Sequence, residues 1–383
     1  MNKYDKEDLK QISDFENKFV EDNNKVVKKF GAKKLVDIGT DLPEFYTFKN
    51  GLIYSHRDFD IFMQNLKKGE KSAIVSGFNP SNNIHIGHIG VFDTNLFFQK
   101  EYGLDVFVPL SDDESYVAGK VPDQEEGLKR ALRLVRSLIA YGYDLNKTHV
   151  IIDQLYTNIY NLAIKLSKGI TMSEIKDVYG YTNDQNTGLH FYPAIQSAHV
   201  TFPQTLGIPN VLVPIGPDED AHLRVSRDVS VKFGYRKTAV LHSIFLPGFD
   251  GDPKMSKSKG NAVFLLDDEK TIKKAVMNAF SGGRATIDEH KEKGGIPEID
   301  ISYLYLKYMF LDSKESKVLY EDYRNGRILS GEMKKLLLDK ILDRSEKFKN
   351  AYNKVTNKDI AKIIMTNEDV DVISLIDKMK IFD

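Results

Sequence analysis

Two short segments carry side chains suited to binding a polyphosphate. The first is His85-Ile86-Gly87-His88, which follows a short apolar run and a loop, in a segment with helical character from Ile84 onward. Unpaired N–H groups at the start of a helix bind phosphate, imidazoles add donors, and a glycine lets a nucleotide lie against the backbone. We therefore expect this segment to bind a nucleotide.

The second segment is Lys254-Met255-Ser256-Lys257-Ser258, in a loop rich in glycine, aspartate and proline. Its two lysines can close over a triphosphate and neutralise the charge of a departing pyrophosphate. Either segment alone is common, as a capped surface helix or a solvated basic loop. Both together, in this order, predict an enzyme that uses ATP.

The pattern between residues 71 and about 265 predicts the fold that positions these segments. Short apolar runs alternate with amphipathic stretches, as in a Rossmann-like, doubly wound parallel sheet of the α/β class. The expected strands are 73–76, 106–110, 149–152, 211–215 and 240–246. A ligand of such a sheet lies at the carboxyl ends of the strands, where both segments and the turns at 111–114 and 216–220 belong.

Three regions are expected along the chain. Residues 1–70 form an N-terminal helical appendage, residues 71–270 the catalytic domain, and residues 271–383 an all-helical C-terminal domain. Helical apolar stripes occur at 302–310 and 333–348. The outer face of the second stripe is basic, and this excess suits either an RNA surface or an ordinary solvated helix. Its basic residues are Lys334, Lys335, Lys340, Arg344, Lys347, Lys349 and Lys354.

Composition fits a globular protein and excludes several kinds of site. The 383 residues are 41% hydrophobic and 28% charged, with a net charge of −1, so any nucleic-acid surface must be local. The absence of cysteine excludes disulfides and thiolate zinc sites. His85 and His88 have the spacing of metal ligands, but no third ligand accompanies them, and we expect no metal site.

The first ten residues are charged and do not resemble an export or transit signal. No apolar run approaches the length of a membrane span. We therefore expect a cytoplasmic protein without a membrane partner.

With both segments, the chain resembles the class I aminoacyl-tRNA synthetases, whose two hallmark sequences match residues 85–88 and 254–258. Other segments resemble the tryptophanyl-tRNA synthetases of the archaeal and eukaryotic type, so that the similarity extends from about residue 25 to about residue 350. These segments are 51–58, 111–114, 191–196, 214–220 with Arg224 and 227–228, and 279–286. The resemblance implies a tryptophan–tRNA ligase, which forms tryptophanyl-adenylate and pyrophosphate from L-tryptophan and ATP and then charges tRNA(Trp).

The resemblance also implies a set of site residues. The expected catalytic residues are His85, His88, Lys254 and Lys257, and Mg²⁺ is expected to accompany ATP. The expected ATP-binding residues are Gly77, Asn79, Pro80, Gly87, Met255, Ser256, Ser258 and Asp218. The expected amino-acid-binding residues are Val75, Glu114, Gln196, Glu219 and Asp250. A homodimer is expected, with the C-terminal domain reading the anticodon of tRNA(Trp).

The amino-acid site departs from the family pattern. Tryptophanyl enzymes of this type have Tyr, Gln and Gln at the positions of Val75, Pro109 and Asp250, where these polar groups sense the indole N–H. Glu219 replaces another Gln, and Ser115 replaces a Lys that meets ATP. A buried indole N–H still needs an acceptor, for which Asp250 and Glu219 are the candidates.

Three other functions remain open at the level of sequence. A tyrosine phenol can donate to the same carboxylates, which makes a tyrosine–tRNA ligase the nearest alternative. A small-molecule nucleotidyltransferase shares the His-x-Gly-His turn, although such enzymes are generally shorter. A catalytically silent paralogue would explain the altered pocket but not the retained histidines and lysines.

Overall fold

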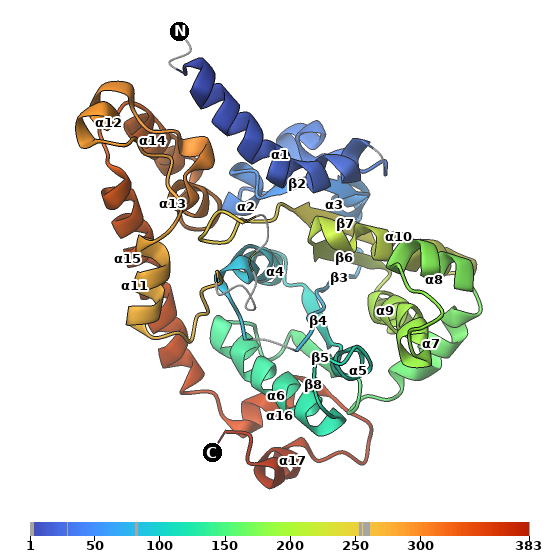
Figure 1. The fold of residues 1–383 in the computed structure, drawn as a ribbon. Helices are drawn as coiled ribbons and strands as arrows, with labels where there is room; N and C mark the ends of the chain where they lie inside the picture. Colours follow the sequence, from blue (N-terminus) through green and yellow to red (C-terminus); the bar gives the residue numbers. More distant parts are fainter. Residues whose placement is uncertain (1–3, 29, 81–82, 253–254, 256–260, 383) are drawn as a thin grey trace. The chain divides into compact units, whose positions relative to one another are not determined.

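The computed structural model describes all residues except 1–3, 29, 81–82, 253–254, 256–260 and 383 (Figure 1). The chain forms two compact units. Unit 1 contains Met1–Ser55, Ile84–Asp93 and Ser243–Lys349, and unit 2 contains His56–Asn83, Thr94–His242 and Asn350–Asp383. These units do not coincide with the three expected regions, whose functional assignment stays a prediction.

Unit 2 is built on a parallel sheet with the strand order β7-β6-β3-β4-β5-β8. The strands are β3 (Ser72–Val75), β4 (Asp105–Leu110), β5 (Thr148–Ile152), β6 (Asn210–Ile215), β7 (Ala239–Ser243) and β8 (Ile364–Met365). The Rossmann-like α/β prediction and its five strands are confirmed. The last of these strands ends at Ser243 rather than at 246, and the next backbone N–H, that of Ile244, donates to the Leu52 carbonyl. The short strand β8 adds to a region expected to be helical.

Helices cover both faces of this sheet, which explains why its strands are almost continuously apolar. In Figure 1, α7 and α9 lie on one side of β4 and β5, and α6 lies on the other. Ala73 and Val75 pack in one core cluster with residues of α7, α9 and α10. The helices are α3 (Phe59–Lys67), α5 (Asp112–Val117), α6 (Gln124–Tyr141), α7 (Ile159–Ser167), α8 (Met172–Tyr179), α9 (Thr187–Thr205), α10 (Asp220–Lys232), α16 (Asn357–Ile363) and α17 (Val372–Met379).

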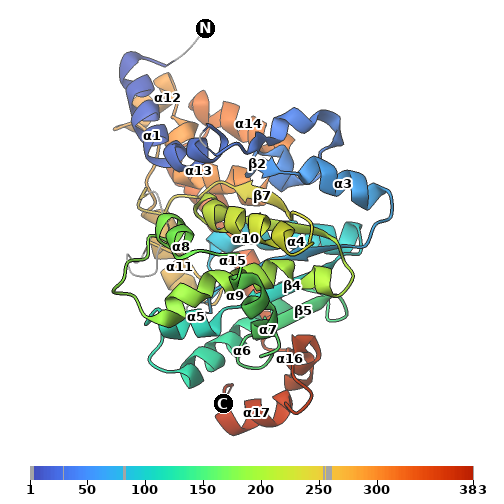
Figure 2. The same ribbon diagram turned by 90° about the vertical axis from the view of Figure 1, so that its right-hand side faces the viewer.

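Local signals set the ends of these helices. The Asp123 side chain accepts from the Glu126 N–H at the start of α6, and Gly142 ends the helix with a φ of 114°. The helix α16 contacts α6 and α17, and Figure 2 shows α16 and α17 side by side. The end of the chain is therefore docked within unit 2.

Unit 1 is mainly helical. It contains α1 (Lys6–Lys28), β1 (Lys33–Lys34), a 3-10 segment (Leu35–Asp41), α2 (Tyr46–Lys49), most of β2 (Ile53–Arg57), the start of α4 (Ile89–Glu101), α11 (Glu269–Met277), α12 (Ile287–Lys293), α13 (Ile301–Tyr305), α14 (Ser313–Arg324) and α15 (Ser330–Tyr352). The expected stripe at 333–348 is confirmed as α15. The stripe at 302–310 is divided between α13 and a π-helical turn, Leu306–Phe310. The expected helical appendage also contributes strands.

The basic face of α15 is partly used within unit 1. Arg344 forms an ion pair with Asp93 at 2.5 Å, and the ammonium groups of Lys334 and Lys349 donate to backbone carbonyls. Lys335 and Lys347 remain exposed. The positive charge available to a nucleic acid is therefore smaller than the sequence suggests.

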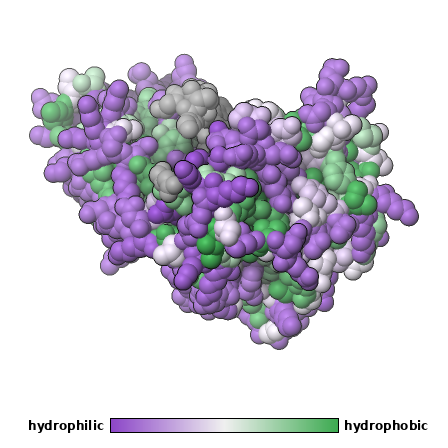
Figure 3. All heavy atoms as spheres, turned by 90° about the horizontal axis from the view of Figure 1, so that it is seen from below, coloured by the Kyte–Doolittle hydropathy of each residue, from purple (hydrophilic) through white to green (hydrophobic). Residues whose placement is uncertain are grey.

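On the face drawn in Figure 3, hydrophilic residues cover most of the surface, with small groups of hydrophobic residues between them. Among the helices of the described part of the chain, none combines the length and hydropathy that crossing a membrane requires.

A buried carboxylate on α10 joins Arg57 and His242 within unit 2. Asp220 is 1% exposed, and its two oxygens accept from Arg57 at 2.7 and 2.9 Å. His242 lies 2.9 Å from the same carboxylate. Burial raises the pKa of Asp220, but the hydrogen bonds from His242 and Arg57 outweigh it and hold the pKa well below its usual value. Asp220 is therefore a charged group that the fold needs.

We expect Asp220→Asn to lower the free energy of unfolding by about 3–5 kcal/mol, because it leaves the buried Arg57 guanidinium without its counter-charge. Asp228→Asn on the same helix is the control. Its carboxylate is largely exposed, so we expect a change below about 1 kcal/mol. Urea unfolding at pH 7 measures both, and equal losses would contradict this account.

The lowered pKa also gives the sign of a pH effect. As the pH falls, the unfolded chain protonates Asp220 near pH 4, before the folded protein does. The stabilisation by Asp220 is therefore complete above about pH 5 and decreases progressively below about pH 4, until the pH reaches the lowered pKa of the folded state. The free energies of unfolding of the protein and of Asp220→Asn, measured with urea, should converge as the pH falls through this range. A difference that stays constant with pH would contradict this role of Asp220.

Candidate active site

Unit 2 contains a cavity of 360 Å³ that opens beside the carboxyl ends of the central strands. This volume lies within the range of roughly 300–1,000 Å³ that is typical of small-molecule sites. Its lining residues are Val75, Gly77, Phe78, Asn79, Pro109, Ser111, Glu114, Lys120, Tyr179, Tyr181, Tyr192, Gln196, His199, Val200, Val213, Ile215, Glu219, His222 and Leu223. Of the expected amino-acid-binding residues, Val75, Glu114, Gln196 and Glu219 come together here.

Three neighbouring strands supply the apolar wall. The parallel register places β3 between β4 and β6, so Val75, Pro109 and Val213 meet near the ends of their strands. A Cβ added at Gly77 would lie 3.3 Å from the Pro109 ring, which is tighter than most contacts. The glycine therefore lets the chain after β3 pass close to β4 and leaves the space beyond open.

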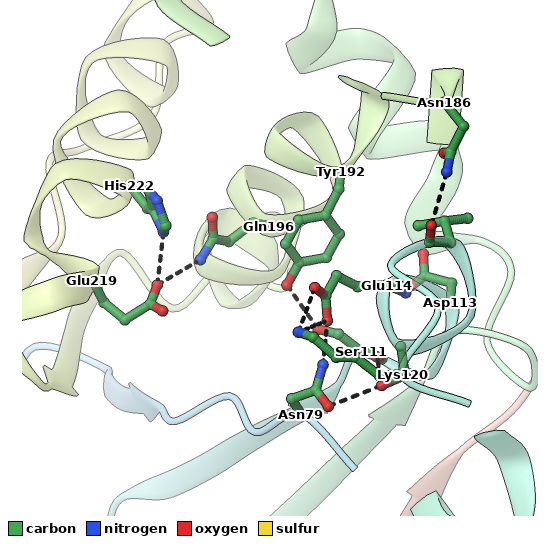
Figure 4. A network of polar contacts seen from close by, with 12 residues as sticks. Asn79, Ser111, Asp113, Glu114, Lys120, Asn186, Tyr192, Gln196, Glu219 and His222 are labelled. Carbon is green, nitrogen blue, oxygen red and sulfur yellow. Dashed lines mark hydrogen bonds and ion pairs between the residues drawn. The ribbon is translucent and has the colours of Figure 1, made fainter. Parts of the chain in front are cut away.

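Polar residues gather around two carboxylates, as Figure 4 shows. Glu114 accepts from the Asn79 amide and from the Lys120 ammonium, the latter at 2.7 and 3.0 Å. The Ser115 hydroxyl donates to the Asn79 oxygen at 3.0 Å and orients that amide. Glu114 thus holds a cation within the protein, which is the kind of group that the ammonium of an amino acid would supply.

Glu219 is the second carboxylate. It accepts from the Gln196 amide at 3.1 Å, and its Oε2 lies 2.9 Å from Nδ1 of His222. The Tyr179 hydroxyl donates to the Gln196 oxygen at 3.1 Å, and the Tyr179 ring stacks on His222 at 4.2 Å. These contacts hold Gln196 and Glu219 in fixed directions, as a site that orients a ligand requires.

A cluster of three carboxyl groups lies behind this cavity. The oxygens of Asp112, Asp113 and Asp153 lie within 4.8 Å of one another. Asp112 accepts from the Asp153 backbone N–H at 2.9 Å and from the Gln154 amide at 2.6 Å. Asp153 is fully buried, and its Oδ1 lies 2.7 Å from Nε2 of His199, which lines the cavity.

Protons reduce the charge of this cluster. Burial and the nearby Asp153 raise the pKa of Asp113 to about 8, and burial and Asp113 raise that of Asp112 to about 6. Asp113 therefore keeps its proton at neutral pH. Burial also raises the pKa of Asp153, the carboxyl group that faces His199, well above its usual value, and its hydrogen bond with Asp113 opposes this effect only in part. Three clustered carboxylates can ligate a cation. Here, protonation already removes part of the negative charge that would be costly to bury.

The His-Ile-Gly-His segment lies in unit 1 and begins later than expected as a helix. His85 is extended and pairs with Phe264, a 3-10 turn covers Ile86–His88, and α4 starts at Ile89. The expected helical character from Ile84 is therefore wrong for the first two residues. The backbone N–H of Ile86 donates to the Val263 carbonyl, a cross-strand bond that keeps the chain extended.

The two imidazoles cap this turn. Nδ1 of His85 accepts from the Gly87 N–H at 3.1 Å, and Nδ1 of His88 accepts from the His85 N–H at 3.2 Å. Burial lowers the pKa of both rings, that of His88 to about 4, so both are neutral at pH 7. Each neutral ring then carries its proton on Nε2, which makes it a directed donor for an anion. A Cβ at position 87 would lie 2.9 Å from the His85 ring, so the glycine also accommodates the cap.

The other expected site residues are not part of the cavity. Lys254, Ser256, Lys257 and Ser258 lie outside the described residues. Met255 is 9% exposed in unit 1, and Asp250 is exposed there and accepts from the Asn261 amide at 2.9 Å. Pro80 is buried and Asp218 is exposed, both in unit 2. The expected roles of these residues stay predictions.

Several cavity residues were not foreseen from the sequence. They are Lys120, Tyr179, Tyr181, Tyr192, His199 and His222. His199 follows Gln196 by three residues, which places both on one face of α9, so helical spacing alone could have found it. Lys120 follows α5 in a turn, and its approach to Glu114 has no signal in the sequence.

Comparisons with known proteins agree with this geometry. The family model for "tRNA synthetases class I (W and Y)" matches residues 67–344. The tryptophan–tRNA ligase of Sulfolobus acidocaldarius is 33% identical over 84% of this chain and 86% of its own length, and that of Methanocaldococcus jannaschii is 33% identical over 88% and 93%. The crystal structure of Plasmodium falciparum tryptophanyl-tRNA synthetase superposes with a TM-score of 0.81 at 31% identity, over 89% of this chain and 96% of its own. The chain therefore belongs to the class I tRNA synthetases of the tryptophan and tyrosine group, and within it to the tryptophan–tRNA ligases.

Proposed function

We propose that this chain activates L-tryptophan with ATP, forms tryptophanyl-adenylate and pyrophosphate, and transfers the tryptophan to tRNA(Trp). The observation that carries the proposal is the cavity of unit 2, which has an apolar wall of Val75, Pro109 and Val213 and two carboxylates at its polar side. The relatives in the comparison are tryptophan–tRNA ligases. An aromatic amino acid has the same division into an apolar ring and a charged head group.

In this proposal, Glu114 and Glu219 receive the α-ammonium, and Gln196 orients it. In the structure, the Lys120 ammonium donates to Oε1 of Glu114 at 2.7 Å. The substrate ammonium takes over this contact, and Lys120 is then available to the carboxylate of the amino acid or to a phosphate. Charge on the protein is thereby exchanged for charge on the substrate, and no carboxylate is left unpaired.

The ATP chemistry rests on positioning and charge neutralisation. We assign the neutral Nε2–H donors of His85 and His88 to the phosphates and assign Lys254 and Lys257 to the departing pyrophosphate. We assign binding of the nucleotide to Gly77 and Gly87, whose lack of a side chain leaves room for it, and to Asn79, Pro80, Met255, Ser256, Ser258 and Asp218. Mg²⁺ bound to the phosphates would neutralise further charge. Because the neutral imidazoles keep their Nε2–H groups at pH 7, they can donate to the phosphates without first gaining a second proton.

The proposal extends to the partners of the chain. tRNA(Trp) is the acceptor, and we assign recognition of its anticodon to the helical region within residues 271–383, where Lys335 and Lys347 are exposed on α15. We also propose a homodimer located in the cytoplasm, as the family resemblance implies.

The two carboxylates of the cavity should respond differently to neutralisation. We expect Glu114→Gln to lower kcat/KM for tryptophan by roughly ten- to a hundredfold, because a charge-assisted contact to the ammonium is lost. Glu219→Gln should change it only a few-fold, since Gln occurs at this position in related enzymes. Tryptophan-dependent exchange of pyrophosphate into ATP measures both, and the reverse order would exclude the assignment.

The segment 254–258 should affect formation of the adenylate rather than binding of the amino acid. We expect Lys257→Ala to lower the rate of adenylate formation by about a hundredfold or more, while tryptophan affinity changes less than about threefold, because the lysine meets charge that develops on pyrophosphate. Lys335→Ala, an exposed lysine of α15, is the matched control. Single-turnover kinetics and calorimetric titration separate the two effects. Parallel losses in both would refute the role.

Charging of tRNA tests the complete proposal. The purified chain should attach labelled tryptophan to a tRNA(Trp) transcript and leave a tRNA(Tyr) transcript uncharged when tyrosine is supplied. Charging with tyrosine alone would identify tyrosine as the substrate. Formation of adenylate without charging of tRNA would exclude the ligase function.

A further inference from the structure

An indole ring bound in the cavity of unit 2 carries an N–H that must find an acceptor. An N–H buried without a partner weakens binding, because it gives up its hydrogen bond to water. The side chains of Val75, Pro109 and Val213 on the apolar wall have no acceptor to offer. The acceptor must therefore come from a polar residue that lies within the cavity lining.

His199 has the required position and chemistry. It lies on α9 and lines the cavity, although its side chain is only 3% exposed. Its Nε2 lies 2.7 Å from Oδ1 of the fully buried Asp153. Among the described residues, its other ring nitrogen, Nδ1, has no hydrogen-bond partner. The ring is thus fixed at one nitrogen by the protein and leaves the second for a ligand.

The buried carboxyl group behind the ring determines which nitrogen carries the proton. When Oδ1 of Asp153 accepts the Nε2–H across the 2.7 Å contact, Nδ1 presents a lone pair. Burial lowers the pKa of His199 to about 4, against a smaller opposing effect of Asp113, and the ring is neutral at pH 7. A neutral ring oriented in this way is an acceptor toward the cavity, comparable to a metal-ligating histidine that is held by a carboxylate at its other nitrogen.

We propose that Nδ1 of His199 accepts the hydrogen bond of the indole N–H and is a specificity-determining group for tryptophan. Gln196, which holds Glu219 at the head-group side, precedes His199 by one helical turn, which separates their Cβ atoms by roughly 5–6 Å. The α-ammonium and the indole nitrogen of one tryptophan are separated by a similar span. Asp153 is a positioning residue that acts through His199. This inference rests on the proposed function and names the group that reads the ring.

The test compares tryptophan with 3-(1-benzothiophen-3-yl)alanine, in which sulfur replaces the indole N–H in a ring of nearly the same shape. Pyrophosphate exchange gives kcat/KM for each. We expect the protein to prefer tryptophan by roughly ten- to a hundredfold. His199→Leu should remove the preference, and His199→Asn should retain part of it, because its amide oxygen lies near the place of Nδ1.

His222→Leu is the matched control, because His222 is a second imidazole of the cavity whose Nδ1 faces Glu219 at 2.9 Å. It should lower exchange with both amino acids by the same factor and keep the preference. A preference that persists in His199→Leu, or a protein without any preference, would overturn the inference and leave tryptophan activation intact. A protein that supports pyrophosphate exchange with other proteinogenic amino acids but not with tryptophan would instead overturn the proposed function and this inference together.

A second measurement does not depend on the folding of the Leu variant. In protein labelled with ¹⁵N-histidine, the Nδ1 resonance of His199, identified by its loss in His199→Asn, should move upfield when tryptophan binds and should move little with the benzothiophene analogue. An unchanged Nδ1 resonance in the tryptophan complex would overturn the inference.

Discussion

The parallel pairing of β3 with both β4 and β6 is the constraint on which the candidate site depends. It aligns Val75 with Phe107 and Ile74 with Leu212, so the carboxyl ends of strands from distant parts of the sequence meet at one edge. The polypeptide leaves the sheet at this edge, and the following loops and helices bring Glu114 and Glu219 to the same cavity. Loss of this register would separate the apolar wall from both carboxylates.

Electrostatics within unit 2 follow from burial. Carboxyl groups in the interior either gain strong donors or keep a proton, and both solutions occur here. Asp220 is charged and is held by Arg57 and His242, whereas burial and Asp153 raise the pKa of Asp113 to about 8. Imidazoles respond in the opposite direction, and burial lowers the pKa of His88 and His199 to about 4. The site therefore binds through oriented neutral donors and acceptors as well as through charge.

The sequence predicted the elements better than it predicted their contacts. Apolar runs located five strands, and helical spacing located α15, because these patterns reflect burial within one element. The strand β8 is too short to form a pattern. The contact of Lys120 with Glu114 and that of Asp153 with His199 join residues whose approach depends on the fold as a whole. Resemblance named Glu114, Gln196 and Glu219. It did not point to His199, because Val75 and Pro109 depart from the family and the candidate acceptors for the ring were Asp250 and Glu219.

The most direct test of this account is amino acid-dependent exchange of labelled pyrophosphate into ATP, measured on the purified chain with each proteinogenic amino acid in turn. The account predicts exchange with tryptophan and background rates with all others, tyrosine included. Exchange that depends on tyrosine in place of tryptophan would contradict the assignment of the cavity in unit 2 to tryptophan. Failure of every amino acid to support exchange would contradict it as well.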